Sequence, residues 1–209
     1  MALVVAIDGP AASGKGTIAA RLGEAFGLPV LDTGLLYRAV GVAVLAAGAG
    51  LDDADAARRA ARALRAQDLD DPALRTDTAA EAASRVAVYP AVRAALIDFQ
   101  RAFASQDGGA ILDGRDIGTV ILPTASAKIF VTATPRARAE RRWRQLSERQ
   151  PTLAYDDVLA DILRRDARDS GRAAAPLRRA DDAVLLDTTD LDIDDAFDAA
   201  RRIVEAARG

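Results

Sequence analysis

The sequence predicts an α/β fold built around a mainly parallel sheet of five strands. Short apolar runs rich in β-branched residues recur along the chain, at 2–7, 28–34, 108–114, 127–134 and 183–189. The first of these runs has no polar alternation, which is typical of a strand buried on both faces. Segments with helical periodicity separate the runs, and this alternation favours a parallel sheet covered by helices.

Helical patterns fill the segments between these runs. Gly27 closes the first helical pattern, which starts at Lys15, and Pro135 opens a later one that is rich in arginine. Residues 52–106 also have helical periodicity, with breaks at DLDDP and VYPAVR. Elsewhere the expected helices cover 15–27, 35–48, 135–149, 152–172 and 192–208.

Length and composition describe an ordinary globular domain. The 209 residues suggest a single domain, and half of them are apolar, enough to bury a sizeable core. The net charge of −3 gives no broad attraction to nucleic acid or to anionic membranes, so any anion site must be a local cluster of arginines. The chain contains no histidine and no cysteine, which excludes Ser–His–Asp relays, thiolate nucleophiles and His/Cys zinc sites.

No segment has the pattern of a membrane span or a targeting signal. The N-terminal residues MALVVAIDG lack the basic region of a signal peptide. The longest uncharged apolar run, 39–51, is shorter than the roughly 20 residues that a bilayer requires. We therefore expect a cytoplasmic protein that binds neither membranes nor nucleic acid. Since no apolar stripe demands a partner chain, we expect a monomer.

The stretch AIDGPAASGKGT, residues 6–17, carries the most informative pattern. A glycine-rich turn follows the first expected strand and leads into the first helix, which is the arrangement of a phosphate-binding loop. Gly9 and Gly14 let backbone amides turn inward, and the helix adds its unpaired N–H groups and the positive end of its dipole. Lys15 is one of two lysines beside 26 arginines, and its compact ammonium fits a narrow phosphate nest better than a planar guanidinium. The alternative is a glycine-rich turn without a ligand.

The loop departs from the strict pattern at one position. Gly16 stands where a serine or threonine normally follows the lysine, and Thr17 comes next. The Thr17 hydroxyl could therefore hold Mg²⁺ directly, or it could contact a phosphate while the metal is bound through water. The guanine-reading motif of GTP switches is absent, because Lys128 is followed by Ile129 and Phe130.

Further motifs occur along the rest of the chain. They are LLYR, YPAVRAAL, DGRDIGTVILP, AKIFVTAT and APLRRADDAVLLDTT, after IDGPAASGKGT at the start. In this order they resemble the bacterial cytidylate (CMP) kinase family over almost the whole chain. The resemblance implies a P-loop NTPase-type three-layer α/β sandwich with core segments 1–32, 107–145 and 176–209, a monophosphate-binding insert at 33–106 and a lid at 146–175.

Long members of the family carry a small antiparallel sheet in the insert. Here the segment RAQDLDDPALRTDTAAEAAS is short and reads as helical, so we expect that sheet to be missing or reduced.

Three charged residues lie at or just after the end of the third expected strand. Asp113 ends this strand at the carboxyl edge of the sheet, where α/β proteins bind ligands, and it could hold Mg²⁺ or its waters; a turn or cap role is the alternative. The Arg115 guanidinium suits the phosphate of an acceptor, and Asp116 could orient it or contact sugar hydroxyls. Read alone, the GRD sequence fits a surface turn equally well.

Four charged residues share one face of the helix expected at 152–172. Arg165, Arg168, Asp169 and Arg172 recur at intervals of three and four residues. They fit either a salt-bridged exposed stripe or a lid that closes over two anionic nucleotides. By resemblance, Arg165 contacts phosphate, whereas Asp169 and Arg172 read the cytosine ring. Its N4 amino group and its N3 and O2 acceptors suit a carboxylate and a guanidinium.

The resemblance assigns the remaining site residues. ATP is expected at Gly9, Pro10, Ala11, Ala12, Ser13, Gly14, Lys15, Gly16, Thr17, Arg141 and Arg142. CMP is expected at Thr33, Arg38, Ser84, Arg93, Arg115, Asp116, Arg165, Asp169 and Arg172. Catalysis is assigned to Lys15, Asp113, Arg115 and Arg165, and Mg²⁺ to Thr17 and Asp113, directly or through water. The other arginines of the helix at 135–149 are expected to face solvent, namely Arg136, Arg138, Arg144 and Arg149.

The expected reaction is in-line transfer of a phosphoryl group from Mg·ATP to CMP or dCMP, giving ADP and CDP or dCDP. The attacking phosphate oxygen is already anionic, so no general base is needed, which agrees with a chain that lacks histidine and cysteine. Another P-loop kinase, acting on UMP, AMP, dTMP or shikimate, is the first alternative. A non-catalytic nucleotide sensor is the second.

Overall fold

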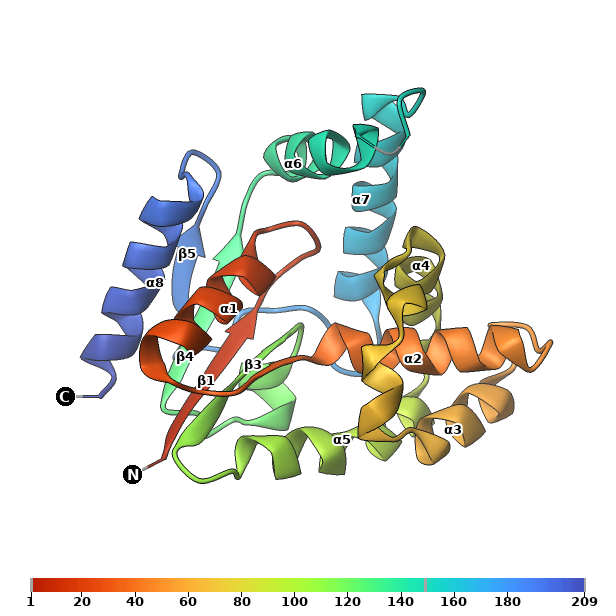
Figure 1. Cartoon of the computed structure of the whole chain (residues 1–209), viewed down its shortest axis with the longest axis horizontal. Helices are drawn as coiled ribbons and strands as arrows, with labels where there is room; N and C mark the ends of the chain where they lie inside the picture. Colours follow the sequence, from red (N-terminus) through yellow and green to blue (C-terminus); the bar gives the residue numbers. More distant parts are fainter. Residues whose placement is uncertain (1, 149, 209) are drawn as a thin grey trace.

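Five parallel strands form the centre of the protein (Figure 1). The computed structural model describes residues 2–148 and 150–208. Its strands are β1 (Leu3–Asp8), β2 (Val30–Asp32), β3 (Gly109–Gly114), β4 (Ala127–Thr132) and β5 (Val184–Asp187), in the order β2-β3-β1-β4-β5. The predicted α/β class is confirmed, and each strand end lies within two residues of its expected position.

Helices connect and cover the strands in the described part of the chain. The α-helices are α1 (Lys15–Phe26), α2 (Thr33–Ala46), α3 (Ala54–Ala63), α4 (Asp77–Val86), α5 (Pro90–Ala104), α6 (Pro135–Ser147), α7 (Tyr155–Gly171) and α8 (Ile193–Ala206). Shorter helical turns are η1 (Ala66–Asp70), η2 (Pro72–Arg75) and η3 (Ile117–Ile121). Residues 33–106, all of which the structure describes, contain helices and no strand, as their periodicity predicted.

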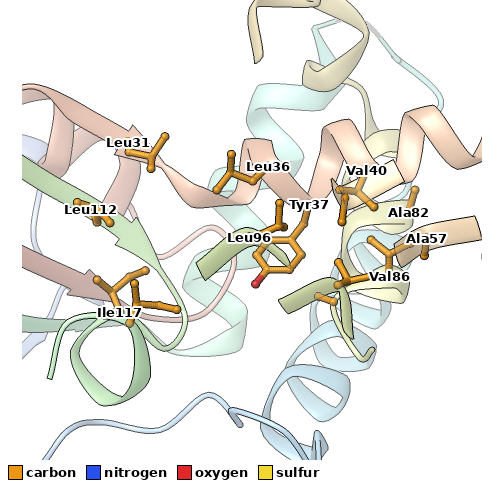
Figure 2. Close-up of a cluster of buried hydrophobic side chains, with 14 of the residues drawn as sticks. Leu31, Leu36, Tyr37, Val40, Ala57, Ala82, Val86, Leu96, Leu112 and Ile117 are labelled. Atoms are coloured by element: carbon orange, nitrogen blue, oxygen red, sulfur yellow. The ribbon is translucent and has the colours of Figure 1, made fainter. Parts of the chain in front are cut away.

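Alternate residues of the strands pack into two separate cores, one on each face of the sheet. On one face, Val5 and Ile7 of β1 pack with α1 and α8. On the other face, Ala6 of β1 and Leu112 of β3 join the cluster formed by α2, α3, α4 and α5. Figure 2 shows this second cluster, in which Tyr37 of α2 lies among the buried side chains. The predicted three-layer arrangement is confirmed.

Short polar side chains begin two helices at the carboxyl edge of the sheet. The Asp32 carboxylate accepts a hydrogen bond from the Gly34 N–H at the start of α2, and Thr134 Oγ1 accepts one from the Ala137 N–H at the start of α6. Pro135 occupies the first position of α6, where its missing N–H costs nothing. Both caps turn the chain away from the strand ends and leave room at this edge.

The end of α7 differs from the prediction. The helix ends at Gly171, and Arg172 follows with φ −62° and ψ 135°, which is extended backbone. Arg172 therefore does not continue the helical face of Arg165 and Asp169, as the spacing predicted. The physical reason is local: glycine has a low helix propensity, and the Asp169 carbonyl accepts a hydrogen bond from the Leu177 N–H at 2.8 Å as the chain turns back.

α6 ends at Ser147, and the predicted end of this helix, Arg149, lies outside the described residues. Among the helices of residues 2–148 and 150–208, none is both long and apolar enough to cross a membrane.

Gly9 joins β1 to the glycine-rich loop at a position where no side chain fits. Its φ is 155°, and a Cβ atom there would lie 2.0 Å from the carbonyl oxygen of Val131 in β4. Gly14, which precedes α1, also has a left-handed φ, of 90°, but no atom lies within 4 Å of the place its Cβ would take. The loop therefore presses against the main chain of β4 at Gly9 and not at Gly14.

We predict that Gly9→Ala lowers the free energy of unfolding by about 3 kcal/mol, because the loop or β4 must move to relieve the overlap with Val131. Gly14→Ala is the matched control, since it adds only backbone strain of about 1–2 kcal/mol. Urea unfolding followed by circular dichroism measures both losses. Equal losses would show that the contact with β4 is unimportant.

Candidate active site

The carboxyl ends of three adjacent strands bring polar residues to one edge of the sheet. In the parallel register, Ile7 of β1 lies beside Asp113 of β3, and Asp113 lies beside Asp32 of β2. The glycine-rich loop and α1 begin at the same edge. Ligands of open parallel sheets bind at this edge, where the strand order reverses, and here the reversal occurs at β1.

The loop between β1 and α1 has the geometry of an anion nest. Gly14 precedes α1 with left-handed backbone and no side chain caps the helix, so its first N–H groups are available to a ligand. The Lys15 Nζ atom lies 3.4 Å from the Pro10 carbonyl oxygen and 3.6 Å from Asp113 Oδ1. Burial lowers the pKa of Lys15, and the nearby Arg115 guanidinium lowers it further. An anionic ligand in the loop would stabilise the charged form of Lys15 and raise its pKa again.

A first cleft, with a volume of about 270 Å³, opens beside Lys15 between the sheet edge, α2, α4 and α7. Charged side chains dominate its lining. The cations are Lys15, Arg38, Arg93, Arg115, Arg142, Arg165 and Arg172, and the carboxylates are Asp32, Asp113, Asp116, Asp161 and Asp169. Seven cations against five carboxylates make this cleft net positive in a chain whose net charge is −3, so it suits an anionic ligand.

Two of these arginines are neutralised inside the cleft. Arg115 Nε donates to Asp169 Oδ2 at 3.0 Å, and Arg93 pairs with Asp116. Burial acts to lower the pKa of Arg115, but the carboxylates of Asp169 and Asp113 outweigh it and the pKa is raised overall. The two pairs join the segment after β3 to α7 and to α5, and they fix where each guanidinium points.

Four other cations of the cleft are less well compensated. Burial lowers the pKa of Lys15, Arg38, Arg165 and Arg172, and neighbouring guanidinium groups add to the effect in each case. A buried charge whose pKa is depressed in this way gains most from a new counter-ion. These four groups therefore mark where an anion binds most favourably.

Three buried polar atoms that line the first cleft have no hydrogen-bond partner among the described residues. They are Ser84 Oγ, Asp113 Oδ1 and Arg172 Nη2. Leaving such a group unsatisfied costs about 1–3 kcal/mol, and native proteins seldom retain one unless a ligand, ion or water completes it. The first cleft is therefore built for a polar ligand.

A second cleft, of about 550 Å³, runs along the other side of the glycine-rich loop. Residues 12–18, Arg141 and Arg142 of α6, and the segment between β5 and α8 line it. The Arg141 guanidinium donates to Thr188 Oγ1 at 3.1 Å, which holds this arginine against the wall of the cleft. Thr17 is exposed there.

The two clefts meet at the phosphate-binding loop. Both are lined by Ala12, Lys15, Gly16, Arg142 and Gln145. Ligands that occupy the two clefts together would therefore approach each other at the Lys15 ammonium.

Asp113 lies at this meeting point. Burial raises its pKa to about 6, the Lys15 ammonium opposes that shift, and the Asp32 carboxylate adds to it. Asp113 Oδ1 has no hydrogen-bond partner in the part of the chain that the structure describes, although the Lys15 ammonium lies 3.6 Å away. A cation bound there, directly or through water, would keep the carboxylate ionised. No cluster of three or more carboxylates that could enclose a metal occurs in the described residues. The site therefore fits a metal such as Mg²⁺, which takes few protein ligands and arrives with phosphate oxygens and water.

The structure brings together most of the residues that the sequence assigned to nucleotide binding. The first cleft contains Thr33, Arg38, Ser84, Arg93, Asp113, Arg115, Asp116, Arg165, Asp169 and Arg172, together with Ala11. The second contains Ser13, Gly14, Thr17 and Arg141, and the shared lining contains Ala12, Lys15, Gly16 and Arg142. Gly9 and Pro10 line neither cleft; Gly9 shapes the loop, and the Pro10 carbonyl oxygen accepts a hydrogen bond from Lys15 Nζ.

One arginine does not lie where the sequence placed it, and another, Arg168, takes the salt-bridged alternative. Arg168 lines neither cleft and pairs with Glu81 of α4 through two hydrogen bonds of 3.1 and 3.0 Å. Arg138, expected to face solvent, is 3% exposed and pairs with Asp166 of α7. The reason is that α7 packs across α6 and covers this side of the helix. Arg144, in contrast, is exposed as predicted.

Sequence reasoning missed four residues with polar side chains that line the first cleft. They are Asp32, Tyr37, Gln145 and Asp161. Asp32 ends β2 at the same edge as Asp113, and that shared position was an available signal. Tyr37 lies in the LLYR motif; the Arg93 guanidinium lies 5.5 Å from its ring centroid, and burial raises its pKa to about 12. Gln145 and Asp161 are polar helix residues without a distinguishing pattern.

Anion nests of this kind, placed where the order of a parallel sheet reverses, define the P-loop class of nucleotide-binding proteins. Within that class the match is specific, because a family model described as cytidylate kinase matches residues 5–206. The chain belongs to the cytidylate kinase family.

Individual relatives cover the whole chain. A cytidylate kinase of Xanthobacter autotrophicus is 64% identical over 206 residues, 99% of each chain. A cytidylate kinase of Caulobacter vibrioides is 60% identical over 208 residues, 100% of this chain and 98% of its own. The crystal structure of an uncharacterized protein from Eubacterium ventriosum covers 98% of this chain and 99% of its own, with a TM-score of 0.56 at 14% identity, and it supports the fold alone.

We predict that Asp113→Asn abolishes most activity and changes stability in a pH-dependent way. The pKa of Asp113 is raised from 3.8 to about 6, so the folded wild-type protein binds its proton more tightly than the unfolded chain. As pH rises from 4 through 6, the wild-type protein should lose about 3 kcal/mol of unfolding free energy relative to the Asn variant. Urea unfolding between pH 4 and pH 7.5 measures this difference, and a difference independent of pH would contradict the raised pKa.

Proposed function

We propose that this chain is an ATP-dependent nucleoside monophosphate kinase that transfers the γ-phosphoryl group of ATP to CMP or dCMP, forming ADP and CDP or dCDP. Membership of the cytidylate kinase family supports the reaction. The observation that carries the proposal is that two clefts meet at Lys15, one along the anion nest and one lined by incompletely neutralised cations. Such a pair of sites can hold a donor and an acceptor in line.

The donor ATP is assigned to the second cleft. Its phosphates lie along residues 9–17 in this proposal, with Arg141 and Arg142 beside them. Residues of the anion nest and both of these arginines line this cleft, which supports the assignment.

The acceptor CMP is assigned to the first cleft. Its phosphate must lie near Lys15, where the clefts meet, and Arg38, Arg115 and Arg165 supply further positive charge there. Its base then reaches the opposite end, toward Ser84, Arg93 and Arg172, while Thr33 and the acidic residues Asp116 and Asp169 complete the lining. The unpartnered Ser84 Oγ and Arg172 Nη2 support a polar ring at that end.

Transfer needs no protein base. The second pKa of a phosphomonoester is about 6, so the acceptor oxygen is anionic at neutral pH and attacks the γ-phosphorus directly. The bond from that phosphorus to the β–γ bridging oxygen breaks, and ADP leaves with the electron pair. Lys15, Arg115 and Arg165 neutralise the charge on the transferred group and hold it in line.

Mg²⁺ is proposed to accompany ATP, with Asp113 holding it directly or through water and Thr17 as a second candidate. When bound, it would supply positive charge that offsets the negative charge of the phosphates. The fit rests on Asp113 Oδ1, which has no hydrogen-bond partner within residues 2–148 and 150–208 although Lys15 Nζ lies 3.6 Å away.

Residues 33–106 and 146–175 are proposed to close over the substrates as insert and lid, against the core formed by 1–32, 107–145 and 176–209. Two ion pairs join α4 to the opposite side of the first cleft: Asp77 with Arg142, and Glu81 with Arg168. Closure would exclude water, which could otherwise accept the phosphoryl group. The cytoplasmic location and the monomeric state stay predictions.

The function is tested by a coupled assay of ADP release with CMP, dCMP, UMP, AMP, dTMP and shikimate as acceptors. We expect CMP and dCMP to be the best acceptors. We expect Lys15→Met to lower kcat by about 100-fold or more while the far-UV circular dichroism spectrum stays unchanged.

Each other outcome of this assay has a definite meaning. A different best acceptor would favour another P-loop kinase. Tight ATP binding without ADP release on any acceptor would favour a nucleotide sensor. Near-normal turnover by the Lys15→Met variant would contradict the assigned role of Lys15.

Two carboxylates compete for the N4 amino group of cytosine. The sequence assigned this role to Asp169, which Arg115 holds at 3.0 Å and which acts on the charge of Arg172 more strongly than any other carboxylate does. Asp116 pairs with Arg93 and also acts on the charge of Arg172, but more weakly. We therefore include Asp116 as the second candidate.

We predict that Asp169→Asn lowers the CMP-over-UMP ratio of kcat/KM by about 10- to 100-fold, because uracil presents an acceptor where cytosine presents the amino group. Asp116→Asn, the matched variant, should lower kcat/KM for both substrates alike. Steady-state kinetics with each substrate measures the ratio. A larger change of the ratio in Asp116→Asn would move base reading to Asp116.

A further inference from the structure

Arg138 lies outside both clefts, yet it is among the most completely bonded charged groups of the chain. Its side chain is 3% exposed. Nε donates to the Ala133 carbonyl oxygen at 2.9 Å, and Nη1 donates to the Ala11 carbonyl oxygen at 3.2 Å. Nη1 and Nη2 also donate to the two oxygens of Asp166, at 3.0 and 2.5 Å. One guanidinium thus joins the end of β4, the glycine-rich loop and α7; we call this contact the Arg138–Asp166 latch.

A second contact joins the same loop to the same pair of helices. Ala12, the residue after Ala11, packs against a small apolar cluster of α6 and α7 that contains Ala139, Val158 and Ile162. Its φ is 59°, a left-handed value that a residue other than glycine adopts only when its surroundings hold it. The tip of the glycine-rich loop is therefore docked onto α6 and α7 by both a polar and an apolar contact.

The position of Asp166 along α7 explains how the latch affects the first cleft. Arg165 comes one residue earlier and Asp169 three residues later, and both line the first cleft. Residues four apart share one face of a helix, whereas Asp166 lies about 100° around the axis from Arg165. Fixing Asp166 to Arg138 therefore fixes the rotation of α7 that turns Arg165 and Asp169 toward the cleft.

We propose that Arg138 and Asp166 are positioning residues, which set α7 against the glycine-rich loop so that Arg165 and Asp169 meet the acceptor in line with the donor. Neither residue lines the first or the second cleft, so they act through other groups rather than on the substrates. The proposal rests on the proposed function and names two further residues that the reaction depends on.

The test uses Arg138→Lys, Asp166→Asn and the double variant. Arg138→Lys keeps the positive charge but removes the planar guanidinium that donates two hydrogen bonds to Asp166. Asp166→Asn keeps the shape of a side chain that is 25% exposed, so both variants should fold. The matched control is Arg144→Lys with Glu140→Gln, the exposed pair on the outer side of α6. The readouts are KM for both substrates, kcat, the ratio of ADP to CDP formed, and hydrogen exchange of the α7 amides without ligand.

We expect each single variant to raise KM for CMP about 10-fold and to lower kcat about 10- to 100-fold, because small misplacements of positioned groups have effects of this size. The ADP-to-CDP ratio should exceed one, since a loosened α7 admits water. The α7 amides should exchange faster, and the double variant should be no worse than the single ones. The control pair should change none of these readouts.

Other outcomes overturn the proposal. Unchanged KM values and an unchanged product ratio, beside a lower melting temperature, would make the latch purely structural. Effects that add in the double variant would show that the two residues do not act as a pair. If the wild-type protein prefers another acceptor, the proposed function fails. Kinetics of the variants and the wild-type protein with that acceptor would then test the latch separately. If no acceptor is used, unchanged hydrogen exchange in α7 rejects the latch and faster exchange leaves it as a structural contact only.

Discussion

The register between β1 and β3 is the constraint on which the site depends. Both strands are buried on both faces, so a shift of one residue would move Ile7 and Ala6 into the wrong cores. This fixed register places Asp113 beside the last residues of β1, and the loop that follows brings Lys15 Nζ to 3.6 Å from the carboxylate. Apolar packing therefore sets the distance between the anion nest and Asp113. The polar groups add charge to a geometry that the packing has already fixed.

Charge balance explains why some arginines are paired and others are not. Removing a charge from water is costly, and a pair repays that cost only when its geometry is good. Arg138 has a carboxylate and two carbonyls around it and needs no ligand. Arg38, Arg165 and Arg172 have depressed pKa values from burial, so the free protein carries a destabilised cluster that an anion relieves. Sites that bind charged ligands tightly often lower the stability of the free protein in this way.

The sequence predicted what local patterns can specify. Glycine spacing, a preceding apolar strand and a rare lysine identified the loop at 9–17, and strand ends identified Asp113. Contacts that depend on how one helix sits against another were not predictable. The burial of Arg138 follows from the angle at which α7 crosses α6, and the pairing of Arg168 with Glu81 follows from the position of α4. Periodicity also led us to extend α7 to Arg172. The spacing of the charged residues is the same whether the helix ends at Gly171 or at Arg172, so the pattern alone does not locate the end.

Asp8, the last residue of β1, links the two halves of the site. Its carboxylate is 5% exposed and accepts hydrogen bonds from the N–H groups of Ile117 and Gly118, both at 2.8 Å. Burial raises its pKa to about 6 although these hydrogen bonds oppose the shift, so the contact is retained against a cost. The segment it holds comes directly after Arg115 and Asp116 in the first cleft, while the loop that continues from Asp8 lines both clefts. Through two backbone hydrogen bonds, Asp8 therefore ties the wall of the first cleft to the strand from which the glycine-rich loop begins.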